Sequence, residues 1–376
     1  MDIVTAFLNG ELEEDIYMKP PPGIDFGPGT SNKTCHLLKS LYGLKQAPRV
    51  WNDTIDTALL DFGFKRSMKD PCIYYLWRDD KLLILGLYVD DLVIACDCDE
   101  LLADAKKFIL STYDAKDMGE IRFLLGMLIE YDRKNRTLDI SQTAYVERLL
   151  TKFRMDNCKP ASTPIVDAMS MVILNKDTTS QKRLSRELHS SYRSGVGGLL
   201  YLARCTRPDI SFAISFLSRF LSDPFYCHWN ALLRVFAYLR GTTKFGISYG
   251  RKNVEGTDLH AFTDASHASD PADRKSIGGF CVFLNGGPVS WGSRKQKTLT
   301  ALSSFEAEYV ALTDMSKDVL FIRHLLEELG SPVVGSTTIW CDNDSSIANC
   351  NNAKISNRNK HVQTRYHYIR EHVDQT

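Results

Sequence analysis

The sequence of 376 residues contains no apolar run near the ~18 residues that a membrane-spanning helix needs. Its first residues, MDIVTAFLNG, also lack the basic and apolar regions of a signal peptide. The ten cysteines show neither CxxC pairs nor Cys/His metal spacing, which excludes a zinc knuckle and other zinc sites. These absences predict an intracellular protein without a membrane partner, whose cysteines are reduced.

Neither charge sign is in excess, because Lys+Arg and Asp+Glu each number 46. A dedicated nucleic-acid-binding protein is usually basic overall, so this chain must meet any polyanion through local basic surfaces. The sequence also lacks repeats and low-complexity tracts, and 44% of its residues are hydrophobic. Such a chain can bury a full core, which excludes a disordered or fibrous protein and predicts two or three domains.

Hydrophobic periodicity divides the chain into a β-rich region, a helical region and a second α/β region. The periodicity lapses from Lys159 to about Ser190, where PASTP begins a polar connector. Helical spacing then recurs in VGGLLYLA, ISFAISFLSRFL and WNALLRVFAYL, which predicts a small helical bundle. The predicted domains are 1–160, 191–250 and 256–376, with a linker at 161–190.

The first region contains three apolar strand patterns, KLLILGLYV, LVIAC and IRFLLGMLIE, the last alternating from Ile121 to Ile129. Asp90 and Asp91 separate the first two patterns and therefore lie at the tip of a hairpin. Like charges beside low-dielectric strands repel unless a cation neutralises them, so this pair is a candidate Mg²⁺ site. A solvated turn that uses Asp for its turn tolerance is the alternative.

The segment Ser40–Asp53 (SLYGLKQAPRVWND) gathers basic and aromatic residues before its first acid. Its candidate nucleic-acid contacts are Tyr42, Lys45, Gln46 and Arg49. With Trp51 nearby, this composition is typical of a surface that contacts phosphates and bases. A Gly/Pro loop with an ordinary basic face is the alternative.

The third region, from Asp258, predicts three strands followed by a helix. An Asn285-Gly286 turn joins the second and third strands, and Ser303 with Glu306 fits a capping box at the start of the helix. Glu308 lies on the apolar stripe of that helix, where a carboxylate at the core edge needs a partner.

A further short strand ends at Asp342 in TIWCDN, before another helix. This element order places Asp264, Glu308 and Asp342 on neighbouring elements, and three such acids suit divalent metals that hydrolyse a phosphodiester. Each acid alone is more typical of a cap, a turn or a solvated charge. Basic residues flank the site, and those taken as nucleic-acid contacts are Arg294, Lys295, Lys297, Lys360 and Arg365. They would bind backbone and sugar rather than read bases.

Four segments in the first half, MDIVTAFLNGELEEDIYMKPPPG, SLYGLKQAPRVW, LYVDDLVIA and DMGEIRFLLGM, resemble the reverse-transcriptase region of copia-type LTR retrotransposon Pol polyproteins. Four later segments, TDASHASDPADRKSIGGF, VSWGSRKQKTLTALSSFEAEYVAL, WCDN and NRNKHVQTRYHYIRE, resemble the copia-type ribonuclease H domain. The resemblance covers essentially the whole chain. It implies a multidomain α+β and α/β fold: a reverse-transcriptase palm with an antiparallel sheet and helices, a helical thumb or connection, and a ribonuclease H-like mixed sheet with helices.

The resemblance also implies roles for the two sets of acids. The catalytic and metal-binding residues of the polymerase would be Asp2, Asp90 and Asp91. Those of the ribonuclease H would be Asp264, Glu308 and Asp342. Each site would hold two Mg²⁺ or Mn²⁺ ions, about 3.5–4 Å apart in such two-metal enzymes. Tyr42, Gly43, Lys45 and Gln46 would line the template and nucleotide side.

The partners implied by the resemblance are RNA/DNA hybrids, template-primer, deoxynucleoside triphosphates and other Pol or Gag chains. A Gag-like structural protein is itself disfavoured by the missing zinc knuckle. The implied location is cytoplasmic, in association with particles, or nuclear. A degenerate or co-opted relic that binds nucleic acid without catalysis is the alternative function.

The sequence departs from the family pattern at two places. Family members carry a fingers region before the position of Asp2, where this chain has one residue. We therefore expect a polymerase fragment with little DNA synthesis, in which the strand carrying Asp2 frays. Where family members read KHID, Gln363 replaces the acid. The candidate substitutes for that acid are His361, His367 and Asp374.

Overall fold

The computed structural model describes residues 1–23, 33–166, 168, 171, 182–250, 257–296, 301–351 and 368–373. The chain forms two compact units. The first comprises Met1–Ile121 with His324–Gly330, and the second comprises Arg122–Arg323 with Ser331–Thr376. The predicted divisions at 160, 190 and 250 all fall inside the second unit. In the described ranges, every helix is too short or too polar to span a bilayer.

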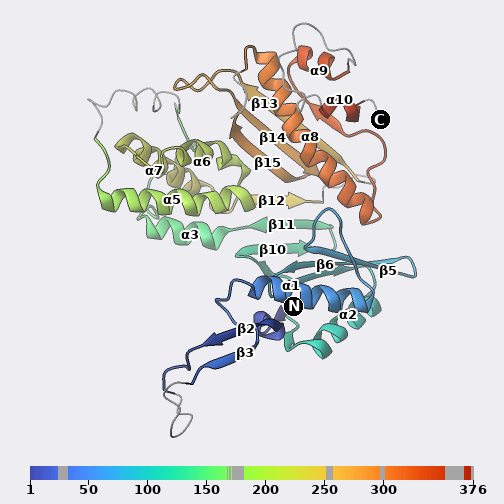
Figure 1. Cartoon of the computed structure of the whole chain (residues 1–376). Coiled ribbons are helices and arrows are strands. Elements are labelled where there is room, and N and C mark those ends of the chain that lie inside the picture. The colour runs from blue at the N-terminus through green and yellow to red at the C-terminus, as the bar shows by residue number, and fades with distance from the viewer. Residues whose placement is uncertain are drawn as a thin grey trace. The chain divides into compact units, whose positions relative to one another are not determined.

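A six-stranded antiparallel sheet in the order β4-β5-β6-β7-β1-β8 organises the first unit (Figure 1). Its strands are β1 (Asp2–Ile3), β4 (Lys65–Arg66), β5 (Ile73–Arg78), β6 (Lys81–Tyr88), β7 (Asp91–Cys96) and β8 (Ala115–Lys116). Alternate leucines of β6, Leu83, Leu85 and Leu87, are buried, as the period of a strand requires. They share one core with helices α1 (Ala47–Phe62) and α2 (Asp99–Thr112).

The first unit also contains a separate hairpin of β2 (Glu11–Met18) and β3 (Cys35–Lys39), preceded by a 3-10 helix, η1 (Ala6–Asn9). Large apolar side chains on this hairpin are exposed, with Tyr17 at 60% and Leu38 at 73%. The hairpin adds little to the core of the unit, which lies between the six-stranded sheet and its helices.

The second unit begins with a four-stranded sheet in the order β12-β11-β10-β9. Its strands are β9 (Phe123–Leu124), β10 (Met127–Asp132), β11 (Thr137–Ser141) and β12 (Gly246–Tyr249). The predicted hairpin of Ile121–Glu130 with Thr137–Ser141 is present in its second half, where β10 pairs with β11. The first half of its first strand is wrong, because Leu125 and Gly126 have positive φ values of 50° and 76°. They form a tight turn, so β9 folds back and pairs with β10.

The predicted helical region is confirmed as a group of helices with one apolar core. Its elements are α3 (Thr143–Lys152), α5 (Arg186–Cys205), η2 (Pro208–Ile210), α6 (Ser211–Ser218) and α7 (Tyr226–Gly241). Helix α5 begins inside the predicted linker, where the Ser185 hydroxyl accepts a hydrogen bond from the Leu188 amide at 3.3 Å. The connector sequence therefore contains a helix start.

A mixed sheet in the order β15-β14-β13-β16 completes the second unit. Its strands are β13 (Leu259–Ser266), β14 (Ile277–Leu284), β15 (Gly287–Lys295) and β16 (Thr338–Trp340). The predicted Asn285-Gly286 turn is confirmed, with φ values of 49° and 84°. Strand β16 runs parallel to β13, and the other pairs are antiparallel.

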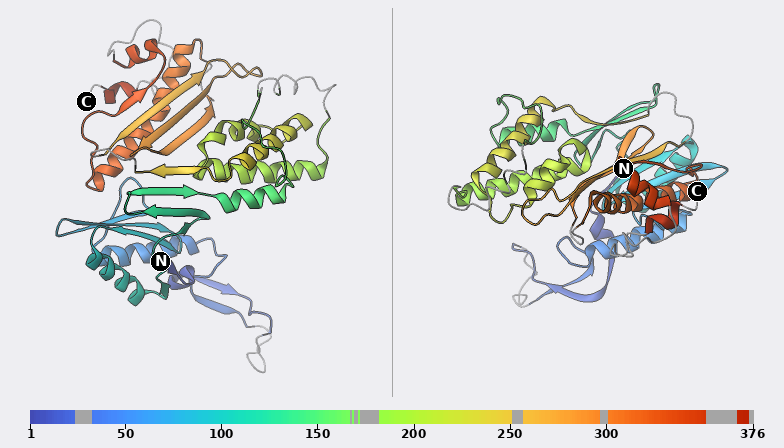
Figure 2. Two further views of the ribbon diagram at one scale, coloured as in Figure 1. Left: turned by 180° about the vertical axis from the view of Figure 1, so that it is seen from behind. Right: turned by 90° about the horizontal axis from the view of Figure 1, so that it is seen from above.

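Three helices accompany this mixed sheet: α8 (Ser304–Glu328), α9 (Asp344–Asn351) and α10 (Tyr368–Val373). Helix α8 crosses one face of the sheet (Figures 1 and 2). Its buried residues Tyr309, Leu312 and Met315 join Leu259 and Val282 of the strands in one core. This packing fixes the rotation of α8, and therefore the direction in which Glu308 projects.

Candidate functional site

The first candidate centre is the turn that carries Asp90 and Asp91. Tyr88 pairs with Asp91, so Val89 and Asp90 form a two-residue turn between β6 and β7. Val89 has a φ of 59°, a conformation that is costly for a β-branched residue. The indole Nε1 of Trp51 donates a hydrogen bond to the Val89 carbonyl at 2.6 Å.

That contact corrects the interpretation of Trp51 as part of a surface that contacts bases. The side chain is only 2% exposed and belongs to the core of the first unit. Aromatic residues in a basic segment look alike in sequence whether they are buried or exposed. Trp51 therefore stabilises the turn from the core side and does not face a ligand.

Asp2 is brought beside this turn by backbone pairing. It pairs with Asp91 on one side and with Lys116 on the other. The Ile3 amide donates to the Asp90 carbonyl at 2.9 Å, and the Met1 ammonium donates to the Leu92 carbonyl at 2.7 Å. The expectation that this strand frays is therefore wrong, because β1 is held between two neighbouring strands.

The carboxylates of this centre interact electrostatically. Burial raises the pKa of Asp91, and the negative charges of Asp90 and Asp2 raise it further. Three acids with only oxygen donors fit a hard divalent cation, which would relieve this repulsion. Their oxygens are nevertheless not gathered within 4.8 Å of one another as the ligand atoms of the second centre are.

The predicted nucleic-acid contacts of the first unit lie on the loop before α1 and on its first turn. Tyr42 is 51% exposed and contacts the Phe7 ring, with centroids 4.8 Å apart. Lys45 is exposed. Gln46 donates to a Glu14 carboxylate oxygen at 3.4 Å. Arg49 is 87% exposed and lies 3.7 Å from the carboxylate of Asp53, a weak solvated pair that a polyanion can displace.

The second candidate centre brings together Asp264 of β13, Glu308 of α8 and Asp342, which follows β16. Glu308 is 4% exposed, and its Oε1 accepts a hydrogen bond from the Ala265 amide at 2.9 Å. Asp264 and Asp342 are exposed and line one cavity on the sheet. The convergence predicted from the element order is therefore present.

The protonation of Glu308 reflects this crowding. Burial raises the pKa of Glu308 to about 7, and hydrogen bonding and charge from Asp264, with charge from Asp342, add to the rise. The Ala265 amide acts in the opposite direction. Acids that repel one another around a buried carboxylate fit a divalent cation, which would remove this cost.

Sequence reasoning missed Cys341 at this centre. The ligand atoms of Glu308, Cys341 and Asp342 all lie within 4.8 Å of one another. Burial raises the pKa of the Cys341 thiol, so it is neutral near pH 7. Its place directly before Asp342 was the available signal, but an isolated cysteine carries little information about position.

The residues at the start of α8 form most of the predicted capping box. The Glu306 amide donates to the Ser303 hydroxyl at 3.4 Å, as in a capping box. The Glu306 carboxylate, however, accepts from the Leu302 amide at 2.7 Å. Glu306 therefore stabilises the start of the helix, and Glu308, two residues later, reaches the acids.

The predicted basic contacts of the second unit differ in their surroundings. Arg294 is exposed. Lys295 is held by two acids, with its Nζ 2.6 Å from an Asp270 oxygen and 2.8 Å from an Asp273 oxygen. The residues Lys297, Lys360, His361, Gln363, Arg365, His367 and Asp374 lie outside the described residues.

The comparisons with known proteins identify the family of this chain. The family model "Reverse transcriptase (RNA-dependent DNA polymerase)" matches residues 1–167. The chain is 40% identical over 377 residues to the retrovirus-related Pol polyprotein from transposon TNT 1-94 of Nicotiana tabacum, covering 100% of this chain and 28% of that protein. It is 36% identical over 373 residues to that from transposon RE1 of Arabidopsis thaliana, covering 99% and 24%.

A shorter relative is matched by this chain over its whole length. The putative transposon Ty5-1 protein of Saccharomyces cerevisiae is 32% identical over 319 residues, covering 85% of this chain and 100% of that protein. The chain thus contains a reverse transcriptase domain. It belongs to the copia-type, retrovirus-related Pol polyproteins of transposons, and it spans about a quarter of the length of the plant Pol relatives.

Proposed function

We propose that this chain is the part of a copia-type Pol polyprotein that joins a reverse-transcriptase palm to a ribonuclease H. In this proposal residues 1–160 form the palm, 191–250 a helical thumb or connection, and 256–376 the ribonuclease H, with a linker at 161–190. The reaction of the last part is cleavage of the RNA strand in RNA/DNA hybrids. The observation that carries the proposal is the convergence of Asp264, Glu308 and Asp342, in which Glu308 is almost fully buried.

The geometry supports a division of labour among the three acids. Glu308 is fixed by the Ala265 amide and by the packing of α8, so it forms the rigid floor of the site. Asp264 and Asp342 approach from two adjacent parallel strands and remain open to solvent, where a phosphate can reach them. When bound between these carboxylates, Mg²⁺ or Mn²⁺ supplies an activated water and stabilises the leaving 3′ oxygen.

Hybrid cleavage is the direct test of this function. With Mg²⁺ or Mn²⁺, we expect the full chain to cut the RNA strand of a labelled hybrid and Asp342→Asn to lose at least about 100-fold in rate, since it removes a metal-binding charge. The control is Asp258→Asn, which removes a half-exposed acid directly before β13, where it pairs with His260 and not with the three acids. Equal inactivity of all three proteins would instead favour a non-catalytic, nucleic-acid-binding relic.

The first centre is proposed as the polymerase site, with Asp2, Asp90 and Asp91 holding divalent cations. Tyr42, Lys45, Gln46 and Arg49 would contact template-primer and the incoming nucleotide. Any nucleotide incorporation that the chain shows on a poly(rA) template should be lost in Asp90→Asn. It should persist in Asp61→Asn, which removes an exposed acid at the end of α1. Incorporation that survives Asp90→Asn would contradict the assignment.

A further inference from the structure

The polar connector that begins with PASTP packs against helix α7 in the second unit. Pro160 lies beside Gly241 at the end of this helix, where a Cβ added to the glycine would be 3.1 Å from the proline Cβ. The Ala161 amide donates a hydrogen bond to the Ala237 carbonyl, about one turn earlier in α7, at 3.1 Å. The connector segment, residues 159–165, therefore follows α7 in the antiparallel direction.

Thr163 continues this contact along α7. Its Oγ1 accepts a hydrogen bond from Nη2 of Arg234 at 2.9 Å. The threonine is exposed, lies outside every helix and strand, and is followed by Pro164. A proline favours an extended backbone in the residue before it, and binding grooves of other proteins accept extended segments readily. The Thr163 hydroxyl is therefore accessible to a modifying enzyme.

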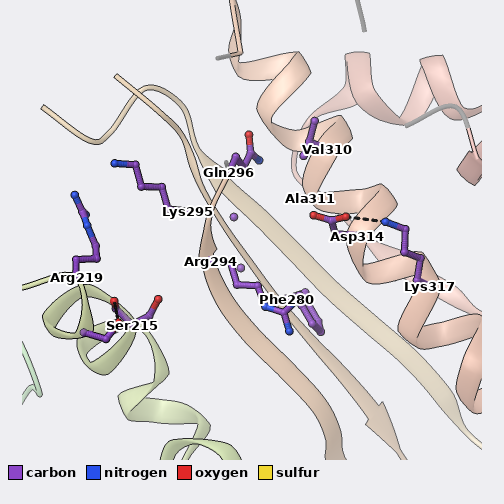
Figure 3. A pocket seen from close by; sticks show the side chains of 13 residues that line it. Ser215, Arg219, Phe280, Arg294, Lys295, Gln296, Val310, Ala311, Asp314 and Lys317 are labelled. Atoms are coloured by element: carbon purple, nitrogen blue, oxygen red, sulfur yellow. Dashed lines mark hydrogen bonds and ion pairs between the residues drawn. The ribbon is translucent and has the colours of Figure 1, made fainter. Parts of the chain in front are cut away.

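Arg234 is a cation without a paired acid. Lys317 of α8, by comparison, pairs with Asp314 at 3.0 Å (Figure 3). Among the residues whose positions are described, no carboxylate comes within ion-pair distance of Arg234. Its Nε is buried and has no hydrogen-bond partner in the same part of the chain. A buried donor without an acceptor is costly, so an anion beside Thr163 would satisfy both the charge and the donor.

We propose that Thr163 is a phosphorylation site for a protein kinase directed to Thr-Pro sequences, and that Arg234 holds the phosphate. In the reaction, Oγ1 of Thr163 attacks the γ-phosphorus of ATP, the bond from that phosphorus to ADP breaks, and the hydroxyl proton passes to the catalytic base of the kinase. The product carries about −1.5 to −2 charge, and its oxygens accept charge-assisted hydrogen bonds from the guanidinium. This contact fastens the connector segment to α7. The inference is independent of the proposed function.

Kinase treatment of the full chain tests the modification. Thr163-Pro164 and Ser331-Pro332 are the two Ser/Thr-Pro dipeptides of the sequence, so the parent for this test carries Ser331→Ala. After incubation with a proline-directed kinase and ATP, peptide mass spectrometry should find one phosphate, on Thr163, and Thr163→Ala should lose it. Ser162→Ala is the matched control, because it removes the neighbouring exposed hydroxyl and should leave the incorporation unchanged. Phosphate that is absent from Thr163, or that lies mainly on Ser162, overturns the proposal.

Hydrogen exchange and thermal melting test the role of Arg234 in the phosphorylated chain. We expect phosphorylation to slow exchange about fivefold or more in peptides from the connector segment and the end of α7. The melting temperature of the second unit should rise by about 2–4 °C. Arg234→Gln should still be phosphorylated but should lose both gains. Arg234→Lys should keep part of them, since it keeps the charge without the fork of donors.

The matched control for charge is Arg193→Gln, which removes an exposed arginine from α5 in the same group of helices. It should keep the full gain on phosphorylation. Equal exchange and melting of the parent before and after phosphorylation overturn the proposal, as does a gain that persists in Arg234→Gln. Neither measurement uses hybrid cleavage, so the outcome of the nuclease test does not affect them.

Discussion

Glu308 illustrates how the surroundings of one side chain set its protonation. The pKa of Glu308 is 4.5 in the unfolded chain and about 7 in the folded protein. Between these pH values, the folded protein keeps a proton that the unfolded chain has released. Stability from this group is therefore present below pH 4.5 and is lost as the pH rises through 7. In the parent protein, the free energy of unfolding should therefore fall by about 1–3 kcal/mol between these two pH values. We expect Glu308→Gln to remove this fall, as measured by denaturant unfolding in EDTA. Identical pH profiles for the two proteins would contradict this expectation.

A bound cation should restore the stability that is lost when Glu308 ionises. Adding Mg²⁺ or Mn²⁺ at pH 7 neutralises the repulsion among the acids and binds only the folded state, so the melting temperature should rise with concentration. At a concentration 100 times the dissociation constant the gain is about 2.7 kcal/mol. Thermal melts of Asp264→Asn should show a smaller gain, whereas Asp258→Asn should respond like the parent.

The residues of this centre were accessible to sequence reasoning to different degrees. Asp264, Glu308 and Asp342 followed from the order of strands and helix, because register and helix period place side chains in space. Cys341 did not follow, because its distance from Glu308 depends on how β16 is positioned beside β13. Trp51 was misinterpreted for a related reason, as burial is a property of packing and not of residue type.

At the scale of elements, the β6–β7 turn combines strain with support. Val89→Gly should stabilise the first unit by about 1 kcal/mol, because glycine adopts the positive φ of 59° without the cost of a Cβ. Trp51→Phe should act in the opposite direction, by about 1–2 kcal/mol, because it leaves the Val89 carbonyl without its donor. Denaturant unfolding measures both, and equal signs for the two substitutions would refute the account.

Turns also show where sequence patterns succeed and fail. Asn285-Gly286 was predicted correctly because both residue types tolerate positive φ. Leu125-Gly126 adopts a similar turn, but a leucine inside an apolar alternation indicates a continuous strand. Pairing of β9 with β10 overrides that local preference.

At the scale of the whole molecule, Asp270 connects elements that the sequence assigns to separate domains. Its carboxylate is fully buried and binds both Arg219, the residue after α6, and Lys295 of β15. Trp291 of β15 adds a hydrogen bond from its Nε1 to the Ala203 carbonyl of α5 at 2.6 Å. Helices and mixed sheet therefore share one unit, although periodicity alone separates them at residue 250.

We expect Asp270→Asn to destabilise these parts together, by about 3–5 kcal/mol, because it leaves two cations facing a neutral amide. Hydrogen exchange followed by mass spectrometry should show faster exchange in peptides from both α5–α6 and β13–β15. Asp273→Asn is the control, since Asp273 is more exposed and, among the described residues, forms an ion pair with Lys295 but not with Arg219. Faster exchange confined to the sheet would show that the two parts unfold independently.

The thiol of Cys341 gives the second centre a vulnerability that its acids alone would not have. Soft cations such as Cd²⁺ prefer sulfur, whereas Mg²⁺ prefers oxygen. A soft ion held by Cys341, Glu308 and Asp342 would block the carboxylates to which we assign hydrolysis in the proposed function. We therefore expect Cd²⁺ to inhibit hybrid cleavage in competition with Mg²⁺, and Cys341→Ser to relieve that inhibition while keeping the activity.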